Sequence, residues 1–374
     1  MKAALHLLLL VVAAIGVLSA LACHQSEPAR GKGTSEKVIS EIRARLESTD
    51  ILPREEPLVL RSFEPLPGAA WVGNAVAYGC YRRGQAPGLM GPSESQILED
   101  LQLITDHWKL IRVYGADDDT RRILDVIRQH DLPIKVMLGI WLEAEDGRPE
   151  QHRANIGQVL RGIELANRYS AQVVAVSVGN ETQVYWSAHR MEPPHLIRYI
   201  RAVRAAVAVP VTTADDFNFW NKPESRPVAE EIDFVVTHIH PLWNGKSLGE
   251  AVGWMDSVWS DVRKLHADRL VVLGETGWAT AYDPALSGPG EQGSLVKGEV
   301  GLAGQASFLS QLHRWVEANQ VTTFLFEAFD EPWKGGGESS STDHIEKHWG
   351  VFNADRLPKE SFLQYLAARH RVAD

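Results

Sequence analysis

Residues 173–181 read VVAVSVGNE, a run of small and β-branched apolar side chains that ends in glycine, asparagine and glutamate. A second run, LVVLGETGW at residues 270–278, has the same form and also carries a glutamate directly after its apolar part. Branched apolar side chains favour strands, and strands without polar alternation are typical of a parallel sheet that is buried on both faces. The two runs therefore predict an α/β fold with a carboxylate at the end of each strand.

Six further runs of this kind lie along the chain, separated by longer segments with apolar residues at helical spacing. They begin near Trp71, Leu110, Ile134, Val209, Phe234 and Thr322. Helix start signals occur between them, since Ser93 and Gln96 form a capping-box motif and Asp119 can cap the segment that follows it. Eight strand–helix units predict a (β/α)8 TIM barrel. A doubly wound open sheet is the alternative, but no GxGxxG motif follows the first run.

Composition narrows the class of partner. The chain has 374 residues, a formal net charge of -10 and 44% apolar residues. No dense run of Lys and Arg occurs, which argues against a nucleic-acid partner. The two cysteines, Cys23 and Cys80, are too few for a disulfide scaffold or a four-thiolate zinc site. The 12 tryptophans favour aromatic platforms, on which the apolar face of a sugar ring can stack.

The first 22 residues are expected to be an export signal, because Lys2 precedes an apolar stretch from Leu5 to Val17. An uncleaved N-terminal anchor is the alternative. Cleavage before Cys23 would leave an N-terminal cysteine, as in bacterial lipoproteins, so lipid anchoring and plain secretion both stay open. We expect an exported protein that is secreted, periplasmic or lipid-anchored at the cell envelope.

The remaining chain divides into two parts. Residues 23–66 are expected to be a polar tether with one short amphipathic helix, because Ile39, Ile42 and Leu46 recur at helical spacing. Residues 67–374 are expected to form the barrel as a single domain, and the protein is expected to be a monomer.

Catalytic groups of such barrels lie at the C-terminal ends of the strands. Glu181 and Glu275 each follow an apolar strand, where burial raises the cost of a charge. Either alone could cap a helix or sit solvated in a turn. Together they favour glycosidic bond cleavage, in which one carboxyl group protonates the leaving oxygen while the other attacks or supports the anomeric carbon. The other polar or aromatic side chains at strand ends are Tyr78, Tyr114, Trp141, Asn180, Thr213, Asp215, Asp216, His238, His240, Glu327 and Glu331.

Three strings in this order resemble glycoside hydrolase family 17, the β-1,3-glucanases of a retaining (β/α)8 clan: VGNE at 178–181, LGETGW at 273–278 and FEAFDEPWK at 326–334. The resemblance extends roughly from Trp71 to Leu366. It implies Glu181 as general acid/base and Glu275 as nucleophile on a β-glucan polysaccharide or oligosaccharide. If it holds, the two carboxyl groups should lie about 5–5.5 Å apart, the separation of a retaining enzyme.

The resemblance also implies a set of substrate-binding residues. Asn180 is implied to bind the sugar beside the scissile bond, and Glu331, Lys334 and Glu346 to form a supporting charged cluster. The full expected set is Tyr78, Tyr114, Asn180, His240, Trp243, Trp278, Glu327, Glu331, Lys334 and Glu346. We expect Tyr78, Trp243 and Trp278 to stack on sugar rings nearest the cleaved bond. Residues 238–243, HIHPLW, depart from the pattern, since many family members carry a tyrosine beside the proline.

Several alternatives follow from the same residues. A glucanosyltransferase would use the same two glutamates, with a sugar hydroxyl in place of water. His238 and His240 point to one side of a strand and could bind a metal in a metal-dependent barrel hydrolase. Asp117–Asp119 could bind calcium, but it is also typical of an acidic first turn of a helix. A non-catalytic glucan-binding barrel is the last alternative. We expect no metal and no organic cofactor.

Overall fold

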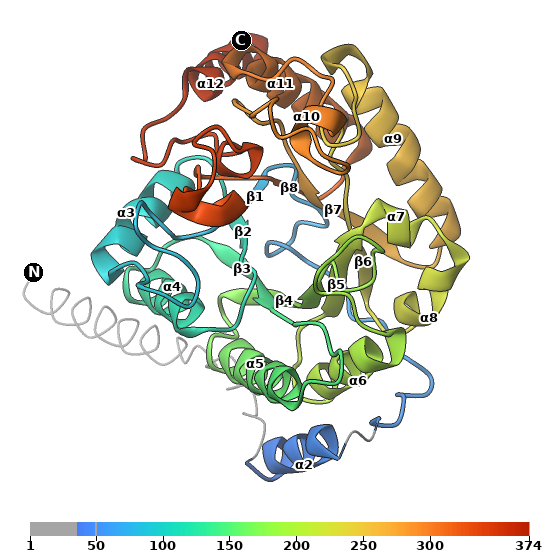
Figure 1. Cartoon of the computed structure of the whole chain (residues 1–374). Coiled ribbons are helices and arrows are strands. Elements are labelled where there is room, and N and C mark those ends of the chain that lie inside the picture. Colours follow the sequence, from blue (N-terminus) through green and yellow to red (C-terminus); the bar gives the residue numbers. More distant parts are fainter. Residues whose placement is uncertain (1–35, 49–50, 374) are drawn as a thin grey trace, which may run out of the picture. The chain divides into compact units, whose positions relative to one another are not determined.

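The computed structural model describes residues 36–48 and 51–373, so the expected export signal and Cys23 lie outside the described residues. Within them, eight parallel strands close into a barrel in the order β1 to β8 (Figure 1). The strands are β1 Ala75–Ala77, β2 Leu110–Arg112, β3 Lys135–Ile140, β4 Val173–Asn180, β5 Val211–Asp216, β6 Phe234–His238, β7 Leu270–Thr276 and β8 Thr323–Leu325.

Barrel closure decides between the two predicted architectures. The first strand pairs with the last, Ala75 with Phe324 and Val76 with Leu325. A doubly wound sheet would leave both of these edges open. The (β/α)8 barrel is therefore confirmed, with all eight strands where the apolar runs predicted them.

Helices surround the barrel, as Figure 1 shows. The α-helices are α2 Glu36–Glu47, α3 Glu94–Thr105, α4 Asp118–Gln129, α5 Pro149–Arg168, α6 Pro193–Arg204, α7 Phe217–Trp220, α8 Arg226–Ala229, α9 Leu248–Leu265, α10 Gln292–Leu295, α11 Leu302–Asn319 and α12 Glu360–Ala373. The 3-10 helices are η1 Pro223–Ser225, η2 Lys334–Ser339 and η3 Ile345–Lys347. None of the helices built from described residues is long and apolar enough to cross a membrane.

Two predicted helix starts have different outcomes. The capping box of Ser93 and Gln96 is present at the start of α3. The cap of α4 is Asp117 and not Asp119, because the Asp117 side chain accepts the hydrogen bond from the Thr120 backbone N–H at 2.9 Å. Asp119 lies in the first turn, where its carboxylate pairs with Arg122. An N-cap side chain must stand just outside the helix to reach the third helical N–H, and only Asp117 does so.

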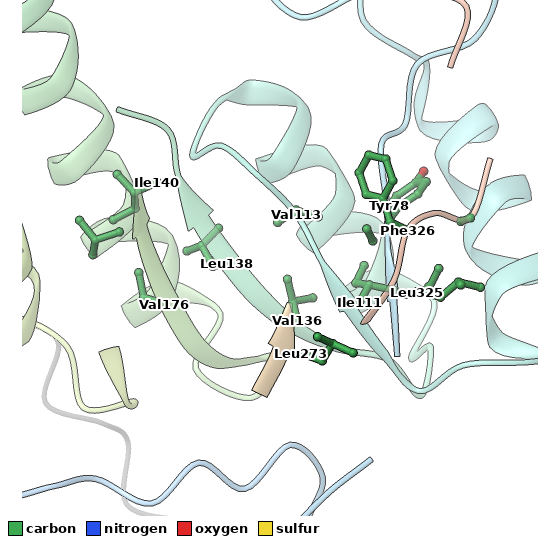
Figure 2. Close-up of a cluster of buried hydrophobic side chains, with 14 of the residues drawn as sticks. Tyr78, Ile111, Val113, Val136, Leu138, Ile140, Val176, Leu273, Leu325 and Phe326 are labelled. Carbon is green, nitrogen blue, oxygen red and sulfur yellow. The ribbon is translucent and has the colours of Figure 1, made fainter. Parts of the chain in front are cut away.

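The core has two layers. Inside the barrel, apolar side chains from all eight strands pack together, and Phe63 stacks on Phe234 with ring centroids 4.4 Å apart. Between strands and helices lies a larger layer, part of which Figure 2 shows with Ile111, Val136 and Val176 on neighbouring strands. Since both faces of each strand are buried, the strands carry no polar alternation until they reach the open end of the barrel.

The predicted helix ahead of the barrel is α2. Ile42 and Leu46 are its buried residues, and the Leu46 carbonyl lies 3.1 Å from Nε2 of His152 on α5. The predicted boundary between tether and barrel at residues 66 and 67 stays a prediction.

Candidate active site

A local irregularity in β7 turns Glu275 into the barrel. Val272 faces the interior, so regular alternation would also point Gly274 inward and Glu275 outward. The register between β6 and β7 shifts just before His238, which pairs with Glu275. This bulge interrupts the alternation, so that the Glu275 side chain points into the barrel as well. Gly274 makes it possible, because a Cβ there would lie 3.1 Å from the His238 ring and would overlap a methyl group of Val236.

A second irregularity sets the position of Glu181. The register between β4 and β5 shifts between Ser177 and Asn180. Gly179 and Glu181 both have left-handed backbone conformations, with φ of 82° and 51°. The Glu181 N–H donates to the Ala214 carbonyl at 2.9 Å, which fixes the end of β4 against β5. Each candidate catalytic glutamate thus lies one or two residues after a glycine, at a break in strand register.

Buried Asp215 on β5 holds the loop that Glu181 begins. Its carboxylate accepts from the backbone N–H groups of Gln183 at 2.8 Å and Val184 at 3.2 Å. Burial, with the nearby charge of Glu181, raises the pKa of Asp215 well above its usual value. Asp215 is therefore a structural neighbour of the acid/base candidate Glu181. Sequence reasoning placed Asp215 at a strand end but assigned it no role.

Glu275 is surrounded by donors. Its Oε1 accepts from Arg112 Nη1 at 2.7 Å and from the Tyr114 hydroxyl at 2.9 Å, and its Oε2 lies 3.3 Å from His240 Nε2. Burial alone would raise the pKa of this carboxyl group. The histidines His238 and His240 and the guanidinium of Arg112 outweigh burial and hold the pKa far below the usual range. Glu275 is therefore ionised, as a nucleophile must be.

Glu181 has a different environment. One histidine faces it, with His238 Nδ1 3.2 Å from Glu181 Oε1, while Nε2 of the same ring lies 3.0 Å from Arg112 Nη1. Both ring nitrogens of His238 therefore have partners, Glu181 at Nδ1 and Arg112 at Nε2. The Glu181 side chain is 24% exposed, against 8% for Glu275. The two carboxyl groups thus differ in solvent access and in nearby charge, as an acid/base and a nucleophile require.

Arg112 connects three strands at the site. Besides Glu275 it donates to the Asn180 side-chain oxygen at 2.5 Å and to the Gly274 carbonyl at 3.2 Å. The residue is 1% exposed and its side chain leaves β2 toward the barrel interior. Sequence reasoning assigned no role to Arg112 and considered His238 for function only as a metal ligand. A charged residue inside an apolar strand was the signal that could have identified Arg112.

The expected charged cluster is present in part. Lys334 Nζ lies 2.7 Å from both Glu327 and Glu331, all three side chains being largely buried. Burial raises the pKa of Glu327, whereas the charge of Lys334 outweighs burial at Glu331 and lowers its pKa. Gly79 allows this approach, because a Cβ there would overlap the Glu331 carboxylate. Burial raises the pKa of Glu346 despite the charges of Lys334 and His240.

Two aromatic residues expected to stack on sugar are packing residues instead. Tyr78 is 2% exposed and its hydroxyl donates to Asp100 on α3 at 3.1 Å; Figure 2 shows it among buried hydrophobic side chains. Trp278 is 1% exposed, stacks on Phe308 and donates its indole N–H to the Glu299 carbonyl. Neither ring has a free face, so the expectation is corrected at both positions. Trp243 is partly exposed and stays a candidate.

Two exposed aromatic residues were missed. Tyr185 and Trp186 are 69% and 50% exposed, and they occupy the centre of a turn in which Ser187 N–H donates to the Val184 carbonyl. Turn centres usually hold small or polar residues, so packing does not explain this pair. The signal was their position, four and five residues after Glu181. Lys222 lies 5.7 Å from the Tyr185 ring centroid, so a second loop borders the same surface.

The metal alternatives find no support in these contacts. His238 and His240 do lie on the same side of their strand, but their nitrogens face Arg112, Glu181 and Glu275. Asp117–Asp119 is the cap and first turn of α4, as its acidic pattern indicated. Over residues 36–48 and 51–373, no group of three or more His, Cys, Asp or Glu side chains is arranged to hold a metal ion.

The chain is similar to known glycoside hydrolases. Residues 75–350 match the model of the BtgE/BtgC glycoside hydrolase domain. The chain is 25% identical over 286 residues to the "Probable glucan endo-1,3-beta-glucosidase btgC" of Aspergillus clavatus, a match that covers 72% of this chain and 39% of that protein. It is 27% identical over 277 residues to the "Glucan 1,3-beta-glucosidase" of Arthroderma benhamiae, covering 70% and 82%. The chain thus spans about two fifths of the length of the btgC relatives it matches.

Solved structures share the fold. An endo-laminarinase from Formosa Hel1_33_131 superposes with a TM-score of 0.68 at 22% identity, covering 79% of this chain and 88% of that one. A glycoside hydrolase family 17 β-1,3-glucanosyltransferase from Rhizomucor miehei superposes with a TM-score of 0.60 at 23% identity, covering 77% and 96%. An active-site mutant of the latter was solved in complex with laminaritriose.

Proposed function

Because this chain belongs to the BtgE/BtgC glycoside hydrolase family, we propose that it cleaves β-1,3-glucan with retention of configuration, through a covalent glycosyl-enzyme intermediate. The resemblance to glycoside hydrolase family 17 is thereby confirmed. One observation carries the proposal. Glu181 and Glu275 reach the same end of the barrel from β4 and β7, and the pair formed by Arg112 and His238 contacts both of them.

The first step uses both glutamates. The Glu275 carboxylate attacks the anomeric carbon, and the bond from that carbon to the glycosidic oxygen breaks as the Glu181 carboxyl group gives its proton to this oxygen. The leaving chain departs with a new hydroxyl group, and Glu275 holds the sugar as an ester. Arg112 and Tyr114 keep Glu275 directed at the site before the attack, since both donate to the same oxygen.

The second step reverses the roles. Glu181, now a carboxylate, takes a proton from water, and the water oxygen displaces Glu275 from the anomeric carbon. His238 contacts Glu181 through Nδ1 and so orients it for both steps. Asn180 accepts from Arg112 through its side-chain oxygen, which leaves its amide nitrogen as the donor for a sugar hydroxyl beside the cleaved bond.

The leaving part of the glucan lies beside Glu181, because that residue protonates its oxygen. We assign Tyr185 and Trp186 to this side, since they stand on the loop that begins at Glu181 and expose large ring surfaces. Flat aromatic faces stack on the apolar faces of glucose rings. The pair thus provides a binding surface for the chain that leaves or, in transfer, for the chain that accepts.

Transfer to a sugar hydroxyl is the second candidate function. It uses the same intermediate, and the exposed pair Tyr185 and Trp186 favours it by holding an acceptor chain beside Glu181. The structural relative from Rhizomucor miehei is a glucanosyltransferase. Products longer than the starting oligosaccharide would identify transfer, and products that are only shorter would identify hydrolysis.

Export, a lipid anchor at Cys23 and a monomeric state are also proposals. The apolar stretch from Leu5 to Val17 supports export. The mass of the mature N-terminus, measured on protein from the native host, separates a free cysteine from a diacylated one. Light scattering on the purified chain tests the monomer.

A product time course on reduced laminari-oligosaccharides of increasing length tests the proposed function. We expect β-1,3-linked products, no cleavage of β-1,4-linked oligosaccharides of equal length, and no turnover by a Glu275→Ala control. Absence of cleavage by a folded wild-type protein on every β-1,3-linked substrate would contradict the proposal.

A further inference from the structure

His240 contacts the one oxygen of Glu275 that Arg112 and Tyr114 leave free. Its Nε2 lies 3.3 Å from Oε2, while Arg112 and Tyr114 both bind Oε1. In the part of the chain that the structure describes, His240 is the one donor found at Oε2. The side chain is 12% exposed, so this contact is largely removed from solvent.

Aromatic rings enclose the other sides of the imidazole. The Phe326 ring stands at 84° to it with centroids 5.4 Å apart, and the Trp349 ring stands at 68° with centroids 5.3 Å apart. The imidazole therefore has a carboxylate at Nε2 and aromatic neighbours around the ring. His240 Nδ1 finds no hydrogen-bond partner among residues 36–48 and 51–373.

The charges around this pair favour a protonated ring. The charged side chains that act on His240 or on its carboxylate partners are Glu275 on β7, Glu181 after β4, Glu346 on η3, Arg112 and His238 on β2 and β6, and Lys334 on η2. Burial lowers the pKa of His240, but the hydrogen bond and charge of Glu275, followed by Glu181 and Glu346, outweigh it and raise the pKa. Arg112 and Lys334 are themselves paired with carboxylates.

We propose that His240 is a cationic positioning residue whose imidazolium pairs with Glu275 and keeps this nucleophile ionised under acidic conditions in which an ordinary glutamate is protonated. The inference rests on the proposed function, because it assigns a pH response to the same site. A neutral donor at this position would form the hydrogen bond but would supply no charge. The site is thereby adapted to cleave glucan in acidic surroundings.

The pH dependence of kcat/KM tests this role, because its acid limb reports the nucleophile of the free enzyme. His240→Gln presents a neutral amide donor to Glu275, and His240→Phe removes the donor. We expect the acid limb of His240→Gln to move up by about one pH unit, which is about a tenfold lower kcat/KM on that limb. His240→Phe should move it at least as far. The matched control is His313→Gln on α11, which breaks an imidazole–carboxylate pair with Glu317 far along the chain and should leave the limb in place.

An acid limb of His240→Gln that coincides with that of the wild type would overturn the proposal. A second measurement needs no turnover: a ¹⁵N NMR titration of the His240 imidazole in the wild type and in Glu275→Gln. The titration midpoint should fall in Glu275→Gln, because the ring loses its carboxylate partner. An unchanged midpoint would contradict the pairing. A lowered midpoint, found when the wild type cleaves no glucan, would instead contradict the proposed function and leave the pairing standing.

Discussion

Glu275 lies near the end of β7 and Glu145 lies beyond the end of β3, and both are held by several donors. Glu145 bonds with Tyr199, His152, Asn155 and Arg198, on α5 and α6. At both carboxyl groups burial would raise the pKa, and hydrogen bonds and positive neighbours outweigh it and lower the pKa. A donor-rich carboxylate with a lowered pKa is therefore not by itself a sign of catalysis.

The difference lies in position. Glu275 is turned into the barrel by the bulge at Gly274 and is linked to Glu181 through Arg112 and His238. Glu145 lies five residues beyond β3, and His152, one of its partners, reaches the Leu46 carbonyl of α2. One network holds the proposed nucleophile inside the barrel, and the other ties α2, α5 and α6 together.

The largest expected effect is on activity. Glu275→Ala should lower kcat/KM on laminarin by about four orders of magnitude or more, since it removes the nucleophile. Glu145→Gln should keep wild-type kcat/KM per folded molecule and lower the free energy of unfolding by about 1–3 kcal/mol, because buried Arg198 loses its charged partner. Kinetics and urea unfolding of both variants check this. Reduced kcat/KM in fully folded Glu145→Gln would show that Glu145 also contributes to catalysis and not only to stability.

The next effect concerns Glu181. Glu181→Ala should lower kcat/KM on laminarin by about 10²–10⁴-fold, the usual range for a lost general acid/base. Aryl glucosides with a good leaving group should keep a fast first step. Azide should rescue this variant with a β-glycosyl azide product, and Glu275→Ala with an α-glycosyl azide. The opposite result, an α product from Glu181→Ala and a β product from Glu275→Ala, would make Glu181 the nucleophile and Glu275 the acid/base.

The fold and the two glutamates could be predicted because they rest on local pattern. Apolar runs identify buried strands, and the glutamates after the fourth and seventh runs stand out because a charge directly after a buried strand is costly. The resemblance then supplied Asn180 and Lys334. The predicted separation of the two carboxyl groups, about 5–5.5 Å, stays a prediction.

Other features depend on register and on long-range packing, which a sequence does not display. The bulge at Gly274 requires knowing how β6 pairs with β7. Trp278 and Trp186 are equally plausible sugar platforms by residue type, and only the fold shows that the first is buried and the second exposed. The Glu145 network joins segments that lie 53 and 54 residues apart in the chain. The partners of Glu145 belong to no sequence motif that would have predicted the network.

A smaller effect is expected on the pH dependence of stability. The pKa of Glu145 is lowered in the folded state, so its contribution to stability is complete above its unfolded pKa and is lost as pH falls through the folded value. Glu145→Gln should therefore lose less stability than the wild type between about pH 5 and pH 3. Thermal unfolding across that range measures it. Parallel losses in both proteins would show that Glu145 does not carry this dependence.

The smallest effect concerns the two tryptophans. Trp186→Ala should raise KM for long laminari-oligosaccharides several-fold, since one aromatic platform contributes about 1 kcal/mol, with little change in stability. Trp278→Phe should lower the free energy of unfolding and leave KM per folded molecule unchanged, because its ring packs on Phe308. Oligosaccharide kinetics beside unfolding curves test both. An unchanged KM in Trp186→Ala would show that Trp186 does not contribute to substrate binding.

The anomeric configuration of the first-formed sugar reports whether Glu275 itself attacks the anomeric carbon. ¹H NMR spectra recorded within the first minutes of cleavage of a β-1,3-linked oligosaccharide show the configuration before mutarotation. Attack by Glu275 predicts the β anomer first, which later equilibrates to include α. The α anomer as first product would mean direct attack by water, and would contradict the covalent intermediate and the roles of both glutamates.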